Sequence, residues 1–193
     1  MKTAISISIA TYILLAIACT KESIKPSVSA ISQSSQIAQH FIGEHFGGGI
    51  IFYLDKTKQH GLIAATADPE EPSRWSFVDT ITGARAIRLG AGFNNTRRII
   101  AVQGDPGADA EGYAALEVAE MSINGYKDWL LPSKAELNEL YKQKNVVGGF
   151  GPYAYWSSCE IDVSTAWFQN FGDGAQHAGQ KIAGYAIRPI RYF

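Results

Sequence analysis

The first stretch of the chain is apolar and almost uncharged. After Lys2, the run AISISIATYILLAIA carries no charge up to Cys19, and the polar segment TKESIK follows. The run is shorter than the roughly 20 residues that cross a bilayer, and the small residue Ala18 stands directly before the cysteine. The pattern predicts an export signal over residues 1–18, with Cys19 as the first residue after cleavage.

Beyond this segment the pattern becomes polar and irregular before it turns hydrophobic again. Residues 19–40 are rich in serine, contain Pro26 and show no sustained apolar period, which predicts a flexible tether. Residues 41–193 have the length of one domain, and their short hydrophobic runs are separated by turn residues. We therefore expect one folded domain that follows a leader and a tether.

The first half of this domain combines strand and helix patterns. GGGIIFYLD and LIAATA are short β-branched and aromatic runs on either side of KTKQHG, which predicts a hairpin. In GFNNTRRIIAVQG, Asn94 or Asn95 can cap a short helix, and Gly104 ends it. A second helix is expected in ADAEGYAALEVAEM, with Asp109 as its cap.

The second half begins with a capped helix and ends in strands. In LPSKAELNELY the side chain of Ser133 can accept the backbone N–H of Glu136 while the carboxylate of Glu136 reaches back, which is a capping box. From residue 145 onward, glycines separate short aromatic runs that are typical of strands joined by turns. Helices in the middle and strands at both ends predict an α+β fold, with short helices packed on small antiparallel sheets.

Charge and cysteine content narrow the function. The formal net charge is -1 at pH 7, and it becomes -2 after loss of residues 1–18, which contain one Lys and no acid. Such a balance does not favour nucleic acid as a partner. If Cys19 is acylated, Cys159 has no partner within the chain, so a disulfide framework is excluded. A lone Cys159 is more typical of a small buried residue than of a reactive thiol.

The segment LLAIAC resembles the lipobox of bacterial lipoproteins, although Ala16 stands where leucine is commonest. The resemblance implies that the thiol of Cys19 is acylated and binds membrane lipid, each buried methylene contributing about 0.8 kcal/mol. An ordinary secretory leader with an unrelated cysteine is the alternative. The first interpretation gives an exported, membrane-anchored lipoprotein at the outer membrane or the cell surface.

Several stretches of the domain are distinctive when they occur together in this order. They are GGGIIFYLD, HGLIAA, GFNNT, GYKDWLLPSKAELNELY, YWSSCE, AWFQNF, DG and the closing IRPIRYF. Together they resemble the Lcl C-terminal domain family, over residues 43–193. The resemblance implies a compact fold similar to C-type lectins and to formylglycine-generating enzymes, in exported bacterial proteins. The collagen-like adhesin for which the family is named is associated with sulfated polysaccharides, but the collagen-like repeats are absent here, and fold alone does not fix function.

The residues around DWLLPS are expected to brace the fold rather than to form a site. Pro132 fixes φ before the capped helix, and Trp129 is expected to pack inside. Asp128 can accept hydrogen bonds from neighbouring loops, a common task of buried carboxylates. The residues assigned to the framework are Asp128, Trp129, Pro132, Ser133, Glu136, Trp167 and Arg188.

Aromatic, amide and arginine side chains are the candidates for a binding surface. An aromatic ring can stack on the apolar face of a sugar while amides bond its hydroxyls, but the aromatics can equally fill the core. One of Arg188 and Arg191 is expected inside, bonded to carbonyls or to an acid such as Asp128; the other can meet a sulfate or carboxylate outside. A recognition surface is expected in loops 92–96, 148–160 and 169–177. The ligand-binding candidates are Asn94, Asn95, Tyr155, Trp156, Asn170, Asp173, Gln176 and Arg191.

No metal, cofactor or catalytic site is predicted. Calcium takes about six to eight oxygen ligands, and the late loops offer only scattered acids such as Glu160, Asp162 and Asp173. Formylglycine-generating enzymes use a cysteine pair, whereas Cys159 stands alone in this domain. The histidines show no metal-ligand spacing, and neither a Gly-x-Ser-x-Gly elbow nor a phosphate loop occurs.

The sequence therefore favours a membrane-anchored exported lipoprotein whose domain recognises or adheres to its partner without changing it. That partner is a glycan, a polysaccharide, or an envelope or host protein. The alternative is a structural cell-envelope protein that contacts other proteins and has no small ligand. An uncharacterised enzyme is the third hypothesis, and Cys159 would be its best nucleophile.

Overall fold

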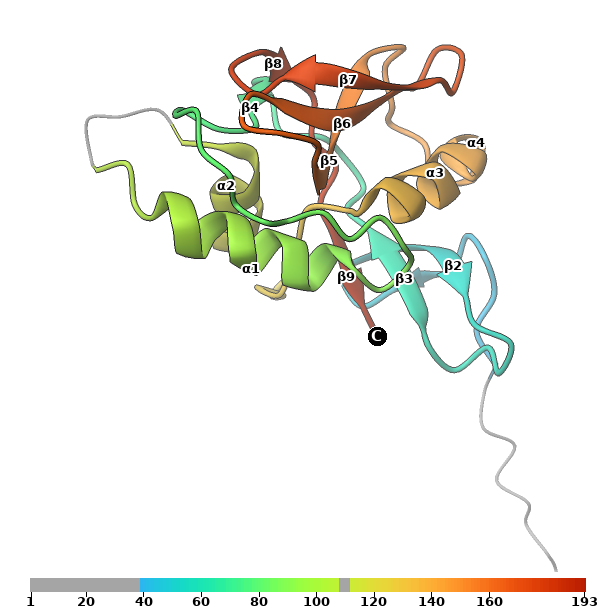
Figure 1. The fold of residues 1–193 in the computed structure, drawn as a ribbon. Helices are drawn as coiled ribbons and strands as arrows, with labels where there is room; N and C mark the ends of the chain where they lie inside the picture. The colour runs from blue at the N-terminus through green and yellow to red at the C-terminus, as the bar shows by residue number, and fades with distance from the viewer. Residues whose placement is uncertain (1–38, 108–111) are drawn as a thin grey trace, which may run out of the picture. The chain divides into compact units, whose positions relative to one another are not determined.

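The computed structural model describes residues 39–107 and 112–193 (Figure 1). The predicted signal peptide, Cys19 and almost the whole predicted tether lie outside the described residues, as does the predicted helix cap Asp109. Among the helices of the described ranges, none has both the length and the apolar character of a membrane span.

One antiparallel sheet contains the beginning and the end of the described chain. Its strands, in spatial order, are β1 (His45–Phe46), β2 (Gly49–Leu54), β3 (Gly61–Ala64) and β9 (Ile190–Tyr192). The hairpin predicted around KTKQHG is confirmed as β2 and β3, with Ile51 opposite Ile63 and a bulge that follows Ile51. The buried Ile, Leu and Phe side chains of these strands match the β-branched and aromatic pattern of the sequence.

The second half of the chain supplies a further antiparallel sheet, at the opposite end of the domain in Figure 1. It consists of β5 (Ala154–Glu160), β6 (Thr165–Asn170) and β7 (Gln176–Gln180), in that order. A short pair, β4 (Ser73–Arg74) with β8 (Gly184–Tyr185), lies beside it. The strands predicted after residue 145 are therefore confirmed.

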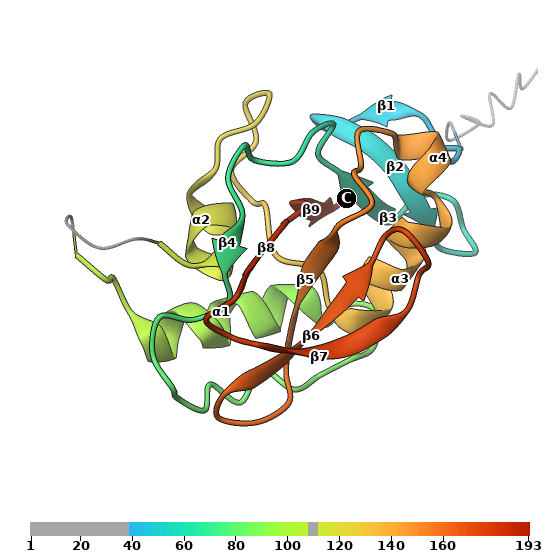
Figure 2. The same cartoon turned by 90° about the horizontal axis from the view of Figure 1, so that it is seen from above.

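The helices lie in two pairs on either side of β5 (Figure 2). They are α1 (Gly92–Gln103), α2 (Ala114–Glu120), α3 (Lys134–Lys142) and α4 (Lys144–Val147). The first two contact each other, and α1 also contacts β5; α3 contacts β2, β5 and β6 and so joins the two sheets. Short helices and small antiparallel sheets confirm the α+β class.

The start of α1 differs from the sequence prediction. Its N-cap is Ala91, so neither Asn94 nor Asn95 caps the helix. The carboxylate of Glu136 in α3 occupies this position instead and accepts the N–H groups of Gly90 and Gly92, at 2.8 and 3.2 Å. A negative charge at a helix N-terminus is favourable, and here one carboxylate serves both α1 and α3. The predicted end of α1 at Gly104, where φ is +67°, is confirmed.

Large aromatic side chains fill the interior between these elements. Trp75, Tyr113 and Trp156 are fully buried in one cluster, where Trp156 packs on Tyr185 with ring centroids 4.4 Å apart. A second cluster lies between β2, α3 and β5 and contains Phe52, Leu137, Leu140, Tyr155 and Phe171. Burial of such aromatic surface is a dominant stabilising contribution, so the interior is a rigid support for the surface loops.

Candidate functional site

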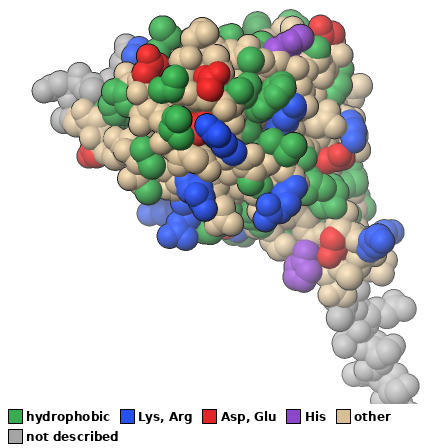
Figure 3. Space-filling model, viewed as in Figure 1, with side chains coloured by type: hydrophobic (Ala, Val, Ile, Leu, Met, Phe, Trp, Pro, Cys, Tyr) green, Lys and Arg blue, Asp and Glu red, His purple; other side chains and the backbone are tan. Residues whose placement is uncertain are grey.

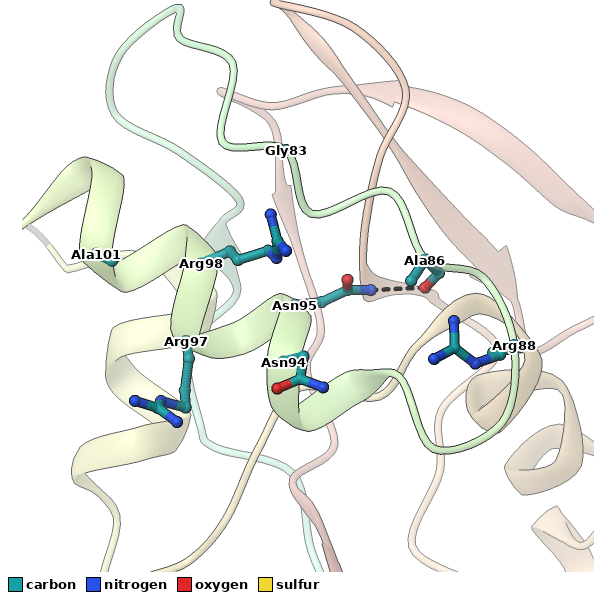
Figure 4. Close-up of a pocket in the computed structure, with 8 residues that line it drawn as sticks. All are labelled: Gly83, Ala86, Arg88, Asn94, Asn95, Arg97, Arg98 and Ala101. Atoms are coloured by element: carbon teal, nitrogen blue, oxygen red, sulfur yellow. Dashed lines mark hydrogen bonds between the residues drawn. The ribbon is translucent and has the colours of Figure 1, made fainter.

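A groove of about 630 Å³ lies between α1 and the segment that precedes it (Figure 4). We call it the arginine groove. Its lining residues are Gly83, Ala86, Arg88, Asn94, Asn95, Arg97, Arg98 and Ala101. They come from two stretches of the chain that the fold places opposite each other.

The helix side of the groove follows from the period of α1. Residues 94, 97, 98 and 101 are spaced by three and four positions, so they lie on one helical face. Ile99, on the other face, is fully buried in the core, which leaves Asn94, Arg97 and Arg98 exposed. Ala101 has a short side chain and keeps the end of the groove open.

The opposite side is a segment without regular structure that is fixed to the N-terminus of α3. The N–H of Ala135 donates to the carbonyl of Ile87 at 3.0 Å, and the hydroxyl of Ser133 donates to the carbonyl of Arg88 at 2.9 Å. The N–H of Gly90 donates to Glu136 immediately afterwards. The backbone of Arg88 is thereby held in place while its side chain is exposed.

The buried side chain of Asn95 joins the two sides at the floor of the groove. Its Nδ2 donates to the carbonyl of Ala86 at 2.7 Å (Figure 4), and it also lies 3.3 Å from the hydroxyl of Ser158. The thiol of Cys159 donates to the same carbonyl at 3.2 Å. Burial raises the pKa of the Cys159 thiol to about 11, so this sulfur stays protonated at neutral pH and acts as a structural donor.

A buried ion pair fixes the far end of the same segment. The carboxylate of Glu160 accepts the N–H groups of Thr82 and Gly83, at 2.8 and 2.9 Å, and pairs with the ammonium of Lys181 at 2.7 Å. Burial acts to raise the pKa of Glu160, but the hydrogen bonds from Lys181 and the two N–H groups hold it below its ordinary value. The segment from Gly83 to Gly90 is therefore anchored at both ends by carboxylates.

The groove is positively charged. Within residues 39–107 and 112–193, no carboxylate pairs with the guanidinium of Arg88, Arg97 or Arg98, and no acidic residue lines the groove. Arg97 lies over the ring of Phe93, 5.5 Å from its centroid. Basic side chains gather on the face over α1 in Figure 3. Exposed guanidinium groups donate only, and they suit anions that accept two parallel hydrogen bonds, such as carboxylate and sulfate groups.

Two of the predicted ligand-binding aromatics lie in the core. Tyr155 and Trp156 have no exposed surface, because β5 is covered on both faces. The hydroxyl of Tyr155 donates to Asp68 at 2.6 Å, and the indole of Trp156 donates to the carbonyl of Ser73 at 2.9 Å. Neither ring offers a surface to a sugar, so for these two residues the core interpretation replaces the binding one.

The candidates of the β6–β7 turn stabilise that turn and do not line the arginine groove. Oδ1 of Asn170 accepts the N–H of Gly172 at 2.7 Å, and Oδ1 of Asp173 accepts the N–H of Ala175 at 2.9 Å. Gln176 donates to the carbonyl of Lys134 at the start of α3, at 2.9 Å. Of the predicted ligand-binding residues, the groove brings together only Asn94 and Asn95, and the amide of Asn95 is buried.

The two arginines near the end of the chain are both largely buried, which corrects the prediction of one inside and one outside. Arg188 pairs with Asp68 and donates to the carbonyls of Ala65, Gly148 and Gly149. Arg191 binds both oxygens of Asp128, each at 2.8 Å, and its remaining Nη1 donates to the carbonyl of Gly47 at 3.0 Å. Arg191 therefore has no free donor fork for an outside anion.

The framework around DWLLPS is as predicted in most respects. The capping box of Ser133 and Glu136 is confirmed, and Trp129 is buried with its indole donating to the carbonyl of Tyr126 at 3.0 Å. The carbonyl of Pro132 accepts the N–H of Ser158 at 2.7 Å. Asp128 differs, because 57% of its side chain is exposed although it pairs with Arg191.

Trp167, also assigned to the framework, is only partly buried. The ammonium of Lys134 lies 3.1 Å from the centroid of its ring. This cation–π contact links β6 to the first residue of α3. Trp167 therefore supports the packing of α3 while part of its ring faces solvent.

Comparison with known proteins identifies the family. The model of the Lcl C-terminal domain matches residues 67–191, which is well over half of the chain. The chain belongs to the Lcl C-terminal domain family. The match includes every residue of the arginine groove, so the groove lies inside the family domain. No curated protein matches the chain.

Among solved structures, the domain is similar to a fimbrial protein from Bacteroides ovatus. The TM-score is 0.51 at 14% sequence identity, over 74% of this chain and 43% of the fimbrial chain. The similarity at this identity concerns the fold. The matched region spans less than half of that other chain.

The arginines of the groove were not among the predicted site residues. Arg97 and Arg98 follow Asn94 by three and four positions, and the buried Ile99 shows which face of the helix is exposed. That spacing is a signal available from the sequence. Arg88 belongs to a segment without periodicity, and only the contacts with α3 bring it to the groove.

Proposed function

We propose that the chain is an exported, surface-facing recognition protein that binds an anionic polysaccharide in the arginine groove without changing it. The observation that carries the proposal is the set of exposed arginines around the groove, Arg88, Arg97 and Arg98, which have no acidic partner among the described residues. Three like charges around one groove, without an acidic residue in its lining, favour an anionic ligand.

The chemistry of the groove fits sulfate or carboxylate groups on a polymer. A guanidinium donates two parallel hydrogen bonds to such a group, and the amide of Asn94 can bond a neighbouring hydroxyl. The groove is open at its side, so a long chain can lie along α1 and pass beyond it. The adhesin for which the family is named is associated with sulfated polysaccharides, and this also supports the proposed class of ligand.

The proposed location rests on the N-terminal sequence. The apolar run before Cys19 is typical of a leader, and the lipobox-like LLAIAC supports acylation of that cysteine. A membrane anchor followed by a serine-rich tether would hold the domain at a membrane surface, where polysaccharides are available. The similarity to a fimbrial protein supports a place among surface proteins.

The proposal assigns binding and no catalysis. Cys159, the strongest nucleophile candidate, is fully buried, and its raised pKa keeps the thiol protonated. A second function class, a structural envelope protein without a ligand, would leave the exposed arginines of the groove without a role.

Binding of the full chain to heparin and to uncharged dextran tests the proposal. We expect heparin to bind, dextran to bind far more weakly, and salt to weaken the heparin complex. The double variant Arg88→Gln/Arg98→Gln should bind heparin about 30- to 700-fold more weakly, because each of the two lost charge-assisted pairs contributes about 1–2 kcal/mol. The intact mass of the mature chain from the same cells reports whether Cys19 is acylated.

A charge-matched control separates a site from general attraction. Lys127→Gln/Lys142→Gln removes the same two charges from exposed positions outside the groove. This control should bind heparin as the unchanged chain does, to within about threefold. Equal losses in the two double variants, or no heparin binding by the unchanged chain, would reject the groove as the site.

A further inference from the structure

A second pocket, of about 380 Å³, lies at the β2–β3–β9 edge of the domain. We call it the tyrosine pocket. Its lining is mostly apolar and includes Tyr53, Leu62, Leu89 and Tyr192, whereas the arginine groove is lined by polar and charged groups. The two cavities therefore suit different parts of a ligand.

Strand pairing builds the floor of the tyrosine pocket. Tyr53 on β2 lies opposite Leu62 on β3, and Leu62 lies opposite Tyr192 on β9, so the three side chains share one face of the sheet. Neighbouring strands are about 4.8 Å apart, which separates the backbones of the two tyrosines by about 10 Å. The buried side chain of Leu62 lies between them as an apolar floor.

The rim of this pocket carries the polar side chains of Tyr53, Asp55 and His60. Oδ1 of Asp55 accepts from the N–H and hydroxyl of Thr57, at 2.9 and 2.6 Å, so the carboxylate is held at the rim. Among the described residues, neither the hydroxyl of Tyr53 nor the imidazole of His60 has a hydrogen-bond partner. An apolar floor with an acceptor-rich rim matches a pyranose ring, which has an apolar C–H face and hydroxyls around its edge.

One segment of the chain lines both the arginine groove and the tyrosine pocket. Arg88 lines the groove, and the next residues, Leu89 and Gly90, line the pocket. Consecutive Cα atoms are about 3.8 Å apart, so the two linings adjoin along the chain and one long ligand can reach both.

The carboxylate of Glu136 holds both cavities in a fixed relation. One of its oxygens, Oε1, accepts the N–H of Gly90 at 2.8 Å and the hydroxyl of Tyr192 at 2.6 Å. The segment that separates the cavities and one wall of the tyrosine pocket are thus bonded to the same atom. Such preorganisation reduces the entropic cost of binding a ligand that touches both.

We infer that the tyrosine pocket is a second subsite, which takes a sugar ring of the same polysaccharide whose anionic group lies in the arginine groove. The inference rests on the proposed function and adds a requirement for ligand length. A short anionic saccharide fills the groove alone, whereas a longer one also stacks on Tyr53. Affinity should therefore rise with chain length.

Calorimetry of the full chain with heparin oligosaccharides of defined length tests the inference. The unchanged chain should bind an octasaccharide more tightly than a disaccharide. Tyr53→Ala should weaken octasaccharide binding by about tenfold and disaccharide binding by less than about twofold, because one stacking contact is lost. Tyr153→Ala is the matched control, since Tyr153 is 62% exposed and lies outside both cavities. It should bind both as the unchanged chain does.

A second variant keeps the test valid if Tyr53→Ala folds poorly, since Tyr53 packs partly against the core. His60 is exposed, so His60→Ala leaves the core intact and should weaken only the octasaccharide, by about threefold. Equal losses of affinity for the two oligosaccharides, or no loss in either pocket variant, would overturn the inference. The arginine groove would still be the proposed anion site.

Two further outcomes identify which proposal fails. If the pocket variants lose octasaccharide binding while Arg88→Gln/Arg98→Gln retains it, the groove is rejected as the anion site. If sodium decanoate binds the unchanged chain but not Tyr53→Ala, and saccharide binding is the same in both, the pocket takes an acyl chain and the inference is overturned.

Discussion

Five arginines of this domain fall into two regions with opposite surroundings. Arg188 and Arg191, near the end of the chain, are held by Asp68 or Asp128 and by backbone carbonyls, and at most 9% of either residue is exposed. The arginines of the groove are exposed and have no carboxylate partner in the described part of the chain. The same residue type is thus a brace in one region and a recognition element in the other, according to the acceptors that the backbone brings near.

The difference has an energetic basis. A buried guanidinium loses its hydration and must be paired, so removal of the arginine leaves a carboxylate and several carbonyls without a donor. An exposed guanidinium stays hydrated and contributes little to the free energy of unfolding. Substitution of a buried arginine should therefore lower the free energy of unfolding. Substitution of a groove arginine should instead weaken ligand binding and leave the stability almost unchanged.

The largest expected effect on stability comes from Arg188→Met. This change removes the cation that pairs with Asp68, which keeps only the hydroxyl of Tyr155, and it takes a donor from the carbonyls of Ala65 and Gly149. It should lower the free energy of unfolding by about 3–5 kcal/mol. Urea unfolding measures the loss. The matched control is Arg98→Met in the groove, which should change stability by no more than about 0.5 kcal/mol. Similar losses in both variants would contradict the division into two regions.

A smaller loss of stability is expected from Glu136→Gln. This variant tests the carboxylate that holds the segment before α1 in place. The carboxylate accepts the N–H groups of Gly90, Gly92 and Ser133 and the hydroxyl of Tyr192. An amide has one acceptor oxygen and points an NH₂ group at the remaining donors, so the free energy of unfolding should fall by about 2–3 kcal/mol.

The matched control for this change is Glu139→Gln on the same helix. Glu139 makes an ion pair with Lys142 at the surface, so its neutralisation should cost less than about 1 kcal/mol in urea unfolding. If Glu136→Gln is as mild as Glu139→Gln, the carboxylate is not the joint cap of α1 and α3.

The smallest expected effect is the pH-dependent contribution of Asp128 to the free energy of unfolding. Hydrogen bonds from Arg191 hold the pKa of Asp128 below its ordinary value of 3.8. Because the folded pKa is depressed, the contribution is complete above 3.8 and is lost as the pH falls through the folded pKa. Asp128→Asn should cost at most about 1 kcal/mol at neutral pH, since the carboxylate is more than half exposed.

Urea unfolding of Asp128→Asn and of the unchanged chain at several pH values measures this contribution. The difference in stability should be constant at neutral and mildly acidic pH and should shrink toward zero near about pH 2. A difference that grows on acidification would show that the Asp128–Arg191 pair is not what stabilises this end of the sheet.

The features that the sequence predicted correctly depend on residues close together along the chain. The capping box needs only Ser133 and Glu136, three positions apart, and the β2–β3 hairpin depends on two short runs and the turn between them. The end of α1 follows from Gly104, whose positive φ favours glycine. Such local patterns can be predicted from neighbouring residues without knowledge of the fold.

The features that were missed depend on distant segments. Glu136 replaces an asparagine as the cap of α1 from 44 positions away, and Arg191 meets Asp128 from 63 positions away. Alternation along β5 could not show exposure, because both faces of that strand are covered and Tyr155 and Trp156 are both buried.

The arginine groove was missed for a related reason. A net charge of -1 averages over the whole chain and hides a local excess of positive charge. The groove appears only when the segment around Arg88 is hydrogen-bonded to α3 and lies opposite Arg98. Charge counted along the sequence says little about charge on a surface until the fold is known.

The ring of His40, close to the start of the described residues, lies 5.0 Å from the ring of Phe193 at the last residue. A segment whose two attachment points are neighbours can be spliced into a loop of a host protein without stretching that loop. The domain is therefore suited to insertion into a loop of another protein. A circularly permuted chain in which these two residues are joined should retain the same topology.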